Sequence, residues 1–415
     1  MRVIANELKK MWRVKILVLI VALCGLYFVA FLYDWIRLYP RGTWVGALDI
    51  AHHMTEHYGT TLERDDFESF LTLREAIIRD LDLFVQSSAF FNEIGAHSFE
   101  ELEYVRQQLG SRYESLSDDE LRKFHDIALE LGYIVRTRDG VFLTSENETP
   151  ISYHKLRSFE NVESHYRNNI LGEFEWPSFI EHFMEWHALS DAEYRRLVEI
   201  RDSTELLNVL AYDTTERTWR YVSNLAVLVV LVTLILTAPL VSTDRANRVN
   251  WLQYTSKQGR SILKKQFIAV LISAIAMTTI LVGGFIGILL ITTQSYVFWH
   301  SGINSFMSPV FHWFSLTFGQ YMLFMAGVMY ALSIGTASVA FGLSRFSSSL
   351  IKLLFKIVPF FIAVLLFSNW IFSDFLVIVL GGDVFVQMIS LVLALALGMI
   401  VSLVIVQRER KIDIR

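Results

Sequence analysis

The chain has 415 residues, of which 53% are hydrophobic and only 19% are charged, and its formal net charge is −5. This composition excludes a disordered chain and an ordinary soluble protein. Charge is divided unevenly, because residues 34–220 hold 36 acidic and 19 basic side chains and the rest of the chain holds 6 acidic and 18 basic ones. We therefore expect an acidic, water-soluble domain inserted into an apolar protein with basic loops, which is the division that a bilayer produces.

Six stretches are apolar over the length of about 20 residues that a helix needs to cross a bilayer. The first is longer than the hydrophobic part of a signal peptide and has no small-residue cleavage site after it, so we interpret it as an uncleaved anchor. The predicted spans are residues 16–36, 222–241, 267–292, 315–343, 353–372 and 385–406. The predicted fold class is an α-helical polytopic membrane protein with six transmembrane helices.

Lys and Arg gather on one side of this predicted topology. The basic segments are 1–15, 242–266, 344–352 and 407–415, whereas the loops 293–314 and 373–384 contain no Lys or Arg. Because positive loops stay in the cytoplasm, both termini are predicted to be cytoplasmic and residues 37–221 to be extracellular. We expect a multi-pass protein of the plasma membrane.

The region 37–221 carries repeated helix-start signals, in which a Ser or Asp is followed three residues later by a Glu. These pairs are Asp65 with Glu68, Ser98 with Glu101, Ser117 with Glu120 and Ser190 with Glu193. Apolar residues follow at helical spacing, and the last of these helices can continue into the second span. Asp139-Gly140 between the short apolar runs 133–135 and 141–143 predicts one β-hairpin. We therefore predict a mostly helical extracellular domain with one short hairpin.

A short histidine cluster is the stronger candidate for a metal site, and His182 and His187 with Glu185 form a weaker one. His53 and His57 lie one helical turn apart, and Glu56 or His52 would supply a third ligand. No matching partner motif occurs elsewhere in the sequence. Short His clusters are common on solvated helices, so the preferred interpretation is that the chain binds no metal.

The sequence lacks the motifs of several membrane protein classes. The predicted spans have no ionisable residue in their middles, which argues against a proton-coupled carrier. No protease motif is present, and the chain has no Gly-Lys dipeptide and hence no phosphate-binding loop. We expect no catalytic residue in this chain. If ATP powers transport here, another chain binds the nucleotide.

Small residues recur at one-turn spacing in the predicted third and fourth spans. The pairs are Gly283 with Gly287, Ala331 with Gly335, and Ser338 with Gly342. Such pairs let helix backbones approach closely in lipid. We prefer this packing role to the alternative, in which these residues line a substrate path.

Lys and Arg in the loop 242–266 are enough to fix the orientation of the neighbouring spans, but that role does not explain the order of the other residues in the loop. Thr255 or Ser256 is suited to cap a short helix on the inner face of the membrane. The patterned residues are Asp244, Thr255, Ser256, Gly259, Arg260, Lys264 and Lys265. Their order resembles the loop after the second span in permease subunits of ABC-2-type ATP-binding cassette exporters, in a variant with a large extracellular domain between the first two spans.

The N-terminal segment 1–15 is similar to the interfacial elbow helix of that family, with Lys9, Lys10 and Arg13 as its basic residues. The six-span plan with both ends inside is similar too. The resemblance covers the membrane part, a little over half of the chain. The extracellular domain is larger than in simpler members, and the loop 373–384 is shorter than the re-entrant pair of many members.

The resemblance implies a permease subunit that forms the substrate path with a second permease chain, as a homodimer or heterodimer, within membrane lipid. The loop would couple to an ABC ATPase subunit dimer, which would hold ATP and Mg, while this chain would bind no cofactor and no nucleic acid. The cargo would be a peptide, a drug or a lipid-like molecule, and the cell would be bacterial. The chief alternative is a membrane-anchored sensor or immunity protein whose extracellular domain binds a ligand, and a membrane enzyme is the third candidate.

Overall fold

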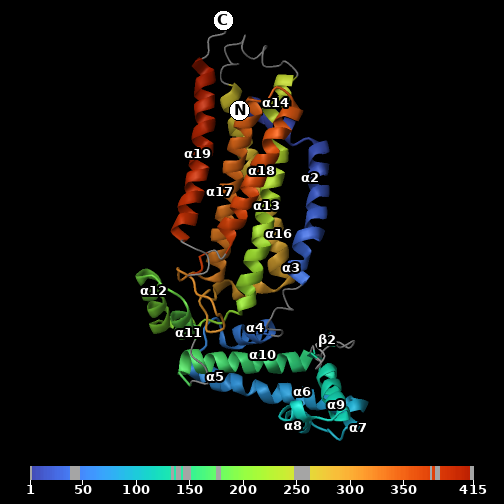
Figure 1. Ribbon diagram of the computed structural model, residues 1–415. Coiled ribbons are helices and arrows are strands. Elements are labelled where there is room, and N and C mark those ends of the chain that lie inside the picture. The colour runs from blue at the N-terminus through green and yellow to red at the C-terminus, as the bar shows by residue number, and fades with distance from the viewer. Residues whose placement is uncertain are drawn as a thin grey trace.

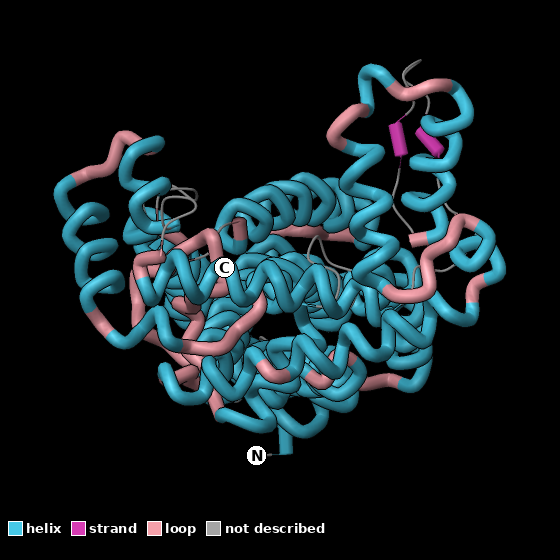
Figure 2. Tube along the Cα trace, turned by 90° about the horizontal axis from the view of Figure 1, so that it is seen from below, coloured by secondary structure: helices cyan, strands magenta, loops and turns pink. Residues whose placement is uncertain are grey.

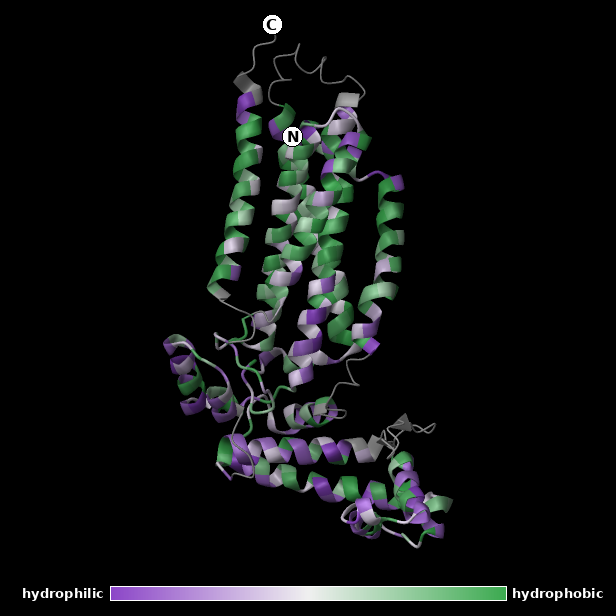
Figure 3. Ribbon diagram, in the orientation of Figure 1, coloured by the Kyte–Doolittle hydropathy of each residue, from purple (hydrophilic) through white to green (hydrophobic). Residues whose placement is uncertain are grey.

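The computed structural model describes residues 2–37, 47–131, 135–136, 142–143, 151–173, 179–246, 262–373, 376–378 and 384–411. Six helices within these segments are long and apolar enough to cross a membrane. They form an upright apolar bundle with a hydrophilic helical domain at one end, here called the polar domain, residues 47–207 (Figures 1 and 3). The chain is therefore built as a multi-pass membrane protein, and both of its ends lie at the opposite end of the bundle (Figure 1).

Each of the six predicted apolar stretches coincides with one of the six long helices, although the fourth stretch, 315–343, begins three residues before its helix. A short helix, α1 (Arg2–Met11), precedes the first span. The spans are α2 (Val14–Tyr27) continued by η1 (Phe28–Leu32) and α3 (Tyr33–Arg37), α13 (Tyr212–Thr237) followed by α14 (Pro239–Ala246), α16 (Ile262–Thr292), α17 (Phe318–Arg345), α18 (Leu350–Phe372) and α19 (Val384–Lys411). Several helices run beyond the predicted stretches, because hydropathy does not detect polar turns that continue a helix outside the apolar layer.

The helix α13 is the centre of the bundle. Within its most apolar window 83% of the residues are buried by the chain, compared with 11% in the first span and 6% in α18. It packs against α16, α17 and α18. The hydroxyl of Ser333 in α17 lies 2.9 Å from that of Thr233 in α13 and 2.8 Å from that of Thr278 in α16. These buried hydroxyls satisfy one another, as polar groups away from water must.

The predicted small-residue pairs differ in how closely they approach other helices. A Cβ added at Gly342 would lie 3.2 Å from a side-chain atom of α19, and one added at Gly398 would lie 3.1 Å from the carbonyl oxygen of Gly335. A Cβ added at Gly283 or Gly287 would meet no atom within 4 Å. Close packing in this chain therefore occurs between α17 and α19, and not at Gly283 and Gly287.

The polar domain lies across the end of the bundle. Its helix α10 packs against α4 and α6, and Figure 1 shows these helices stacked crosswise below the spans. Seen from below, two groups of helices extend to opposite sides, one of them carrying the strands (Figure 2). Its helices are α4 (Ala47–Tyr58), α5 (Arg64–Leu71), α6 (Leu73–Ser87), α7 (Ala89–Glu93), α8 (Phe99–Gly110), α9 (Asp118–Glu130), α10 (Ile151–Tyr166), α11 (Phe179–Trp186) and α12 (Asp191–Asp202).

Three of the four predicted helix starts are confirmed. Ser98, Ser117 and Ser190 cap α8, α9 and α12, and each hydroxyl accepts from the backbone N–H three residues later. The prediction at Asp65 is wrong, since Glu63 caps α5 and forms a capping box with Asp66. Several carboxylates in this acidic run can accept the same N–H groups, so the local pattern alone does not choose between them.

The two strands are short. β1 (Val135–Arg136) and β2 (Phe142–Leu143) pair antiparallel, with Val135 opposite Leu143. The turn predicted at Asp139-Gly140 lies outside the described residues. With two residues in each strand, this pairing contributes little to the fold.

The predicted continuity between the helix at Ser190 and the second span is wrong. α12 ends at Asp202, the 3₁₀ turn η4 (Thr204–Leu207) follows, and α13 starts only at Tyr212. The intervening chain pairs with the segment before α5, where the N–H of Leu62 donates to the carbonyl of Leu207 at 2.9 Å. The Ser203 hydroxyl accepts from the N–H of Glu205 at the start of η4, so a local cap separates the two helices and the tertiary pairing fixes the chain after it.

Candidate functional site

Four polar side chains meet at the end of the bundle that lies away from the polar domain. They are Glu7 and Lys10 of α1, Asp244 of α14 and Gln266 of α16, here called the N-terminal polar cluster. Lys10 Nζ lies 2.9 Å from Glu7 Oε1 and 3.2 Å from Asp244 Oδ2. Gln266 Nε2 donates to Asp244 Oδ2 at 2.7 Å and to Glu7 Oε2 at 3.2 Å. The cluster thereby joins three helices that are remote in sequence.

The cluster is buried and carries two carboxylates for one ammonium group. Glu7 is 5% exposed, Asp244 8% and Gln266 2%. Burial by itself lowers the pKa of Lys10, but its hydrogen bond to Glu7 and the charge of Asp244 outweigh burial and raise that pKa above its ordinary value. Lys10 is therefore charged at neutral pH. Lys10 is the only cation paired with these carboxylates among the described residues, and removing it is costly, so the cluster holds α1, α14 and α16 in one arrangement.

The amphipathic character of α1 explains why it docks here. Glu7 and Lys10 are three residues apart and so lie on one face of the helix. Met11 is buried next to them, and Trp12 donates from Nε1 to the hydroxyl of Ser273 in α16 at 3.0 Å. The polar face and the two bulky residues after it fix α1 along the start of α16.

The structure brings together two residues that the sequence placed in separate predicted sites. Lys10 was predicted in an elbow segment and Asp244 in a coupling loop, and they pair directly. Lys9 and Arg13 are exposed and lie outside the cluster, as do Lys264 and Lys265 in the first turn of α16. The other predicted loop residues, Thr255, Ser256, Gly259 and Arg260, lie outside the described residues.

The loop predicted as 242–266 is shorter than expected. α14 remains helical to Ala246, and α16 starts at Ile262. Sequence reasoning also missed Glu7 and Gln266 as site residues. One signal was available for Glu7, because only six acidic residues lie outside residues 34–220 and two of them are Glu7 and Asp244.

A second, partly buried polar network connects the polar domain to the bundle. Glu205 in η4 accepts two hydrogen bonds from Arg196 of α12, at 3.1 and 2.8 Å. The same carboxylate accepts from Asn304 Nδ2 at 2.6 Å and from the Ser315 hydroxyl at 2.8 Å, both in the connection between α16 and α17. We call Arg196, Glu205, Asn304 and Ser315 the Glu205 cluster. Ser315 was predicted inside the fourth span, but α17 begins at Phe318.

The connection between α16 and α17 is folded tightly against the polar domain. Asn304 Oδ1 accepts from the backbone N–H of His312 at 2.8 Å, and the N–H of Phe306 donates to the carbonyl of Leu206 at 2.8 Å. His312 is 1% exposed, and burial lowers its pKa to about 4. His312 is therefore neutral at physiological pH. Movement of the polar domain and of these two spans is linked through this segment.

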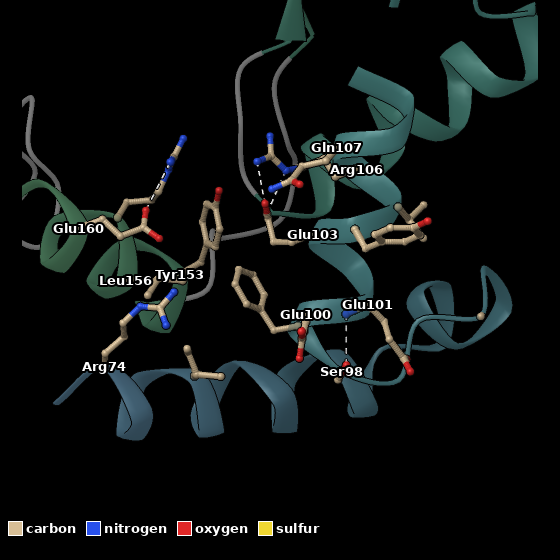
Figure 4. Close-up of a pocket in the computed structure, with 16 residues that line it drawn as sticks. Arg74, Ser98, Glu100, Glu101, Glu103, Arg106, Gln107, Tyr153, Leu156 and Glu160 are labelled. Atoms are coloured by element: carbon tan, nitrogen blue, oxygen red, sulfur yellow. Dashed lines mark hydrogen bonds and ion pairs between the residues drawn. The ribbon is translucent and has the colours of Figure 1, made fainter. Parts of the chain in front are cut away.

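The polar domain contains a pocket of about 1040 Å³ between α6, α8 and α10. Glu103 and Arg106 pair across one side at 2.7 Å, and Figure 4 shows Arg74 rising from α6 toward α10. Arg74 and Glu100 line the pocket without an ion-pair partner among the described residues. The apolar lining comes from the buried side chains of Phe99, Tyr153 and Leu156. Such a surface suits a ligand with both charged and apolar parts.

The histidine cluster does not form a site of converging ligands. The rings of His53 and His57 stack with centroids 4.0 Å apart, and His57 Nδ1 donates to the carbonyl of His53 at 2.9 Å. His52 contacts Phe298 edge to face, with ring centroids 4.7 Å apart. Within the described segments, no three His, Cys, Asp or Glu side chains are grouped so that they could hold a metal ion.

Comparison with known proteins identified no relative of this chain. No protein-family model, no curated protein and no solved structure matches the chain. The two polar clusters and the pocket are therefore the features that bear on the function of the chain.

Proposed function

We propose that this chain is the transmembrane permease subunit of an ATP-driven ABC exporter, working with a separate ATPase pair and a second permease chain. The observation that carries the proposal is the N-terminal polar cluster. It ties α1, which corresponds to the predicted elbow, to α14 and α16, which flank residues 247–261. A partner that pulls on those residues would move all three helices as one unit.

The physics of this coupling sets a condition on the partner. A nucleotide-dependent ATPase shifts the permease between two conformations only if it binds them with different free energy. In this proposal, ATP and Mg are held by the partner, and this chain contributes the path for a peptide, a drug or a lipid-like cargo. The cluster would then lie at the cytoplasmic side, where the basic segments predict it.

Co-purification tests the proposal directly. The full chain is tagged, extracted from its native membrane in mild detergent, and its partners are identified while ATP hydrolysis is measured. We expect a stoichiometric partner with a phosphate-binding loop whose hydrolysis responds to this chain. Recovery of the chain alone after crosslinking would contradict the proposal. In the complex, unchanged coupled hydrolysis in Arg260→Glu would contradict docking at the loop.

A second candidate function is a membrane-anchored sensor or immunity protein. The pocket between α6, α8 and α10 favours it, because the pocket lies wholly in the polar domain and combines charged with apolar side chains. The same purification separates the two candidates. A kinase or peptidase partner in place of an ATPase would favour the sensor.

A further inference from the structure

An apolar groove runs between the first and third spans. Its volume is about 300 Å³, and nearly all of its surface is hydrocarbon. The lining residues on α2 are spaced so that they lie on one face of that helix. Those on α16 have the same spacing and form a longer row. The lining consists of Trp12, Leu17, Ile20, Val21, Cys24, Met277, Ile280, Leu281, Gly284, Phe285 and Ile288.

The groove has a closed floor and an open side. Ile20, Met277 and Leu281 are buried at 4–5% exposure, whereas Val21 is 71% and Ile280 57% exposed. The row on α16 extends over about 17 Å at the rise of a helix. Both walls belong to helices that are able to cross a membrane. The groove therefore opens toward hydrocarbon and has the length of much of an acyl chain.

Gly284 keeps part of the groove open. A Cβ added there would meet no atom within 4 Å, and Gly284 is part of the lining. The neighbouring Gly283 is equally free of contacts but does not line the groove. A large side chain at residue 284 would therefore enter the groove, whereas one at residue 283 would not.

The mouth of the groove carries positive charge. Trp12 closes one end and is held on α16 by its hydrogen bond to Ser273. Arg13 follows Trp12 directly and is exposed, with no ion-pair partner among the described residues, whereas the exposed Lys15 lies on the face of α2 opposite the lining residues. Trp favours the membrane interface, and exposed Arg and Lys there attract anionic head groups. An apolar groove with a cationic mouth is complementary to an anionic phospholipid.

We propose that the groove binds one acyl chain of an anionic phospholipid, with the head group held by Arg13. The bound chain would fill the space between α2 and α16 and support a first span that the rest of the chain buries by only 11%. The inference stands apart from the proposed function, because it requires neither an ATPase nor a cargo.

Native mass spectrometry of the full chain, released from vesicles of equal parts phosphatidylglycerol and phosphatidylcholine, tests the site. We expect selective retention of phosphatidylglycerol by the wild type and by Gly283→Phe. Gly284→Phe fills the groove and should weaken retention about tenfold. The variant Arg13→Gln should lose the preference for phosphatidylglycerol, whereas Lys15→Gln, on the opposite face of α2, should keep it. Equal retention of both lipids by the wild type, or undiminished retention by Gly284→Phe, would overturn the proposal.

A second readout uses the wild-type chain and so does not depend on how the variants fold. Cys24 is the only cysteine and lines the groove, so a bound acyl chain should slow its alkylation by N-ethylmaleimide in delipidated detergent. Added phosphatidylglycerol should protect Cys24, whereas inorganic phosphate should not. Protection by phosphate, or no protection by the lipid, would refute the site. A rapid Cys24–Cys24 disulfide under oxidation would instead assign the groove to a second copy of the chain.

Discussion

Lys10 and Asp244 are 234 residues apart in sequence, and the ammonium nitrogen of Lys10 lies 3.2 Å from both carboxylate oxygens of Asp244. The contact fastens the N-terminal helix to the segment that follows the second span. Glu7 shares the same ammonium group, and Gln266 donates to both carboxylates. One lysine therefore balances charge contributed by two separate helices.

Lys10→Met should destabilise the bundle far more than Lys9→Met. The first change leaves Glu7 and Asp244 buried without a cation, which typically costs about 3–5 kcal/mol. The second removes an exposed charge and should change stability by less than about 0.5 kcal/mol. Thermal unfolding in detergent at neutral pH measures both. Equal midpoints for the two variants would show that the cluster does not hold the helices.

Glu205→Gln should loosen the polar domain from the bundle. Gln cannot neutralise Arg196, whose side chain is only 12% exposed, so the change leaves a poorly compensated cation. We expect a loss of about 3 kcal/mol and faster proteolysis of the connection between α16 and α17. Asp202→Asn is the matched control, because its fully exposed pair with Arg201 should contribute little. The prediction fails if both variants resist protease as the wild type does.

The parts that were predictable from sequence are those set by local physics. Spans are detectable because every apolar stretch of sufficient length must become a helix in lipid. The caps at Ser98 and Ser117 were predictable because each bonds to a group only three residues away. The second span was located but its helix start was not, because the polar first turns of α13 resemble loop sequence.

The clusters were not predictable, because they depend on distances through space. Nothing near Gln266 in the sequence indicates that it faces Glu7, which is 259 residues away. The same holds for Glu205 and Asn304, which are 99 residues apart. Asp244 was named among the patterned loop residues, whereas for Glu7 the one available signal was the rarity of acidic residues outside residues 34–220.

Stability should fall on acidification, in part through His312. Its pKa is lowered by burial from 6.5 to about 4, so folding favours the neutral imidazole. The unfolded chain binds the proton more readily, so this contribution is complete above about pH 6.5 and is lost as the pH falls toward about 4. A shift of this size corresponds to about 3 kcal/mol.

His312→Phe keeps the ring and removes the titration, so its unfolding midpoint should decline less than that of the wild type between about pH 7 and about pH 5. His165, whose pKa burial also lowers to about 4, titrates in the same window and should leave a residual decline in the variant. The comparison uses the change with pH within each protein, which separates titration from any constant effect of the substitution. Parallel pH profiles for the two proteins would contradict a buried, neutral His312.

Gly398→Ala should disturb the contact between α17 and α19, whereas Gly283→Ala should not. The new methyl at residue 398 would lie 3.1 Å from the carbonyl oxygen of Gly335, a backbone atom that has little freedom to move. It would also strain the nearby hydrogen bond from the Ser402 hydroxyl to the carbonyl of Ser338, which is 2.6 Å long. Overpacking of this kind costs about 1–3 kcal/mol.

At residue 283 the added methyl meets open space in the single chain, so thermal unfolding of the monomer should be unchanged. The two alanine variants therefore separate helix packing inside the chain from packing between chains. If Gly283→Ala leaves the monomer intact but weakens association of two copies, measured by crosslinking in the membrane, then this glycine lies at a surface between chains. If Gly398→Ala unfolds at the wild-type temperature, the close approach of α17 and α19 is not a source of stability.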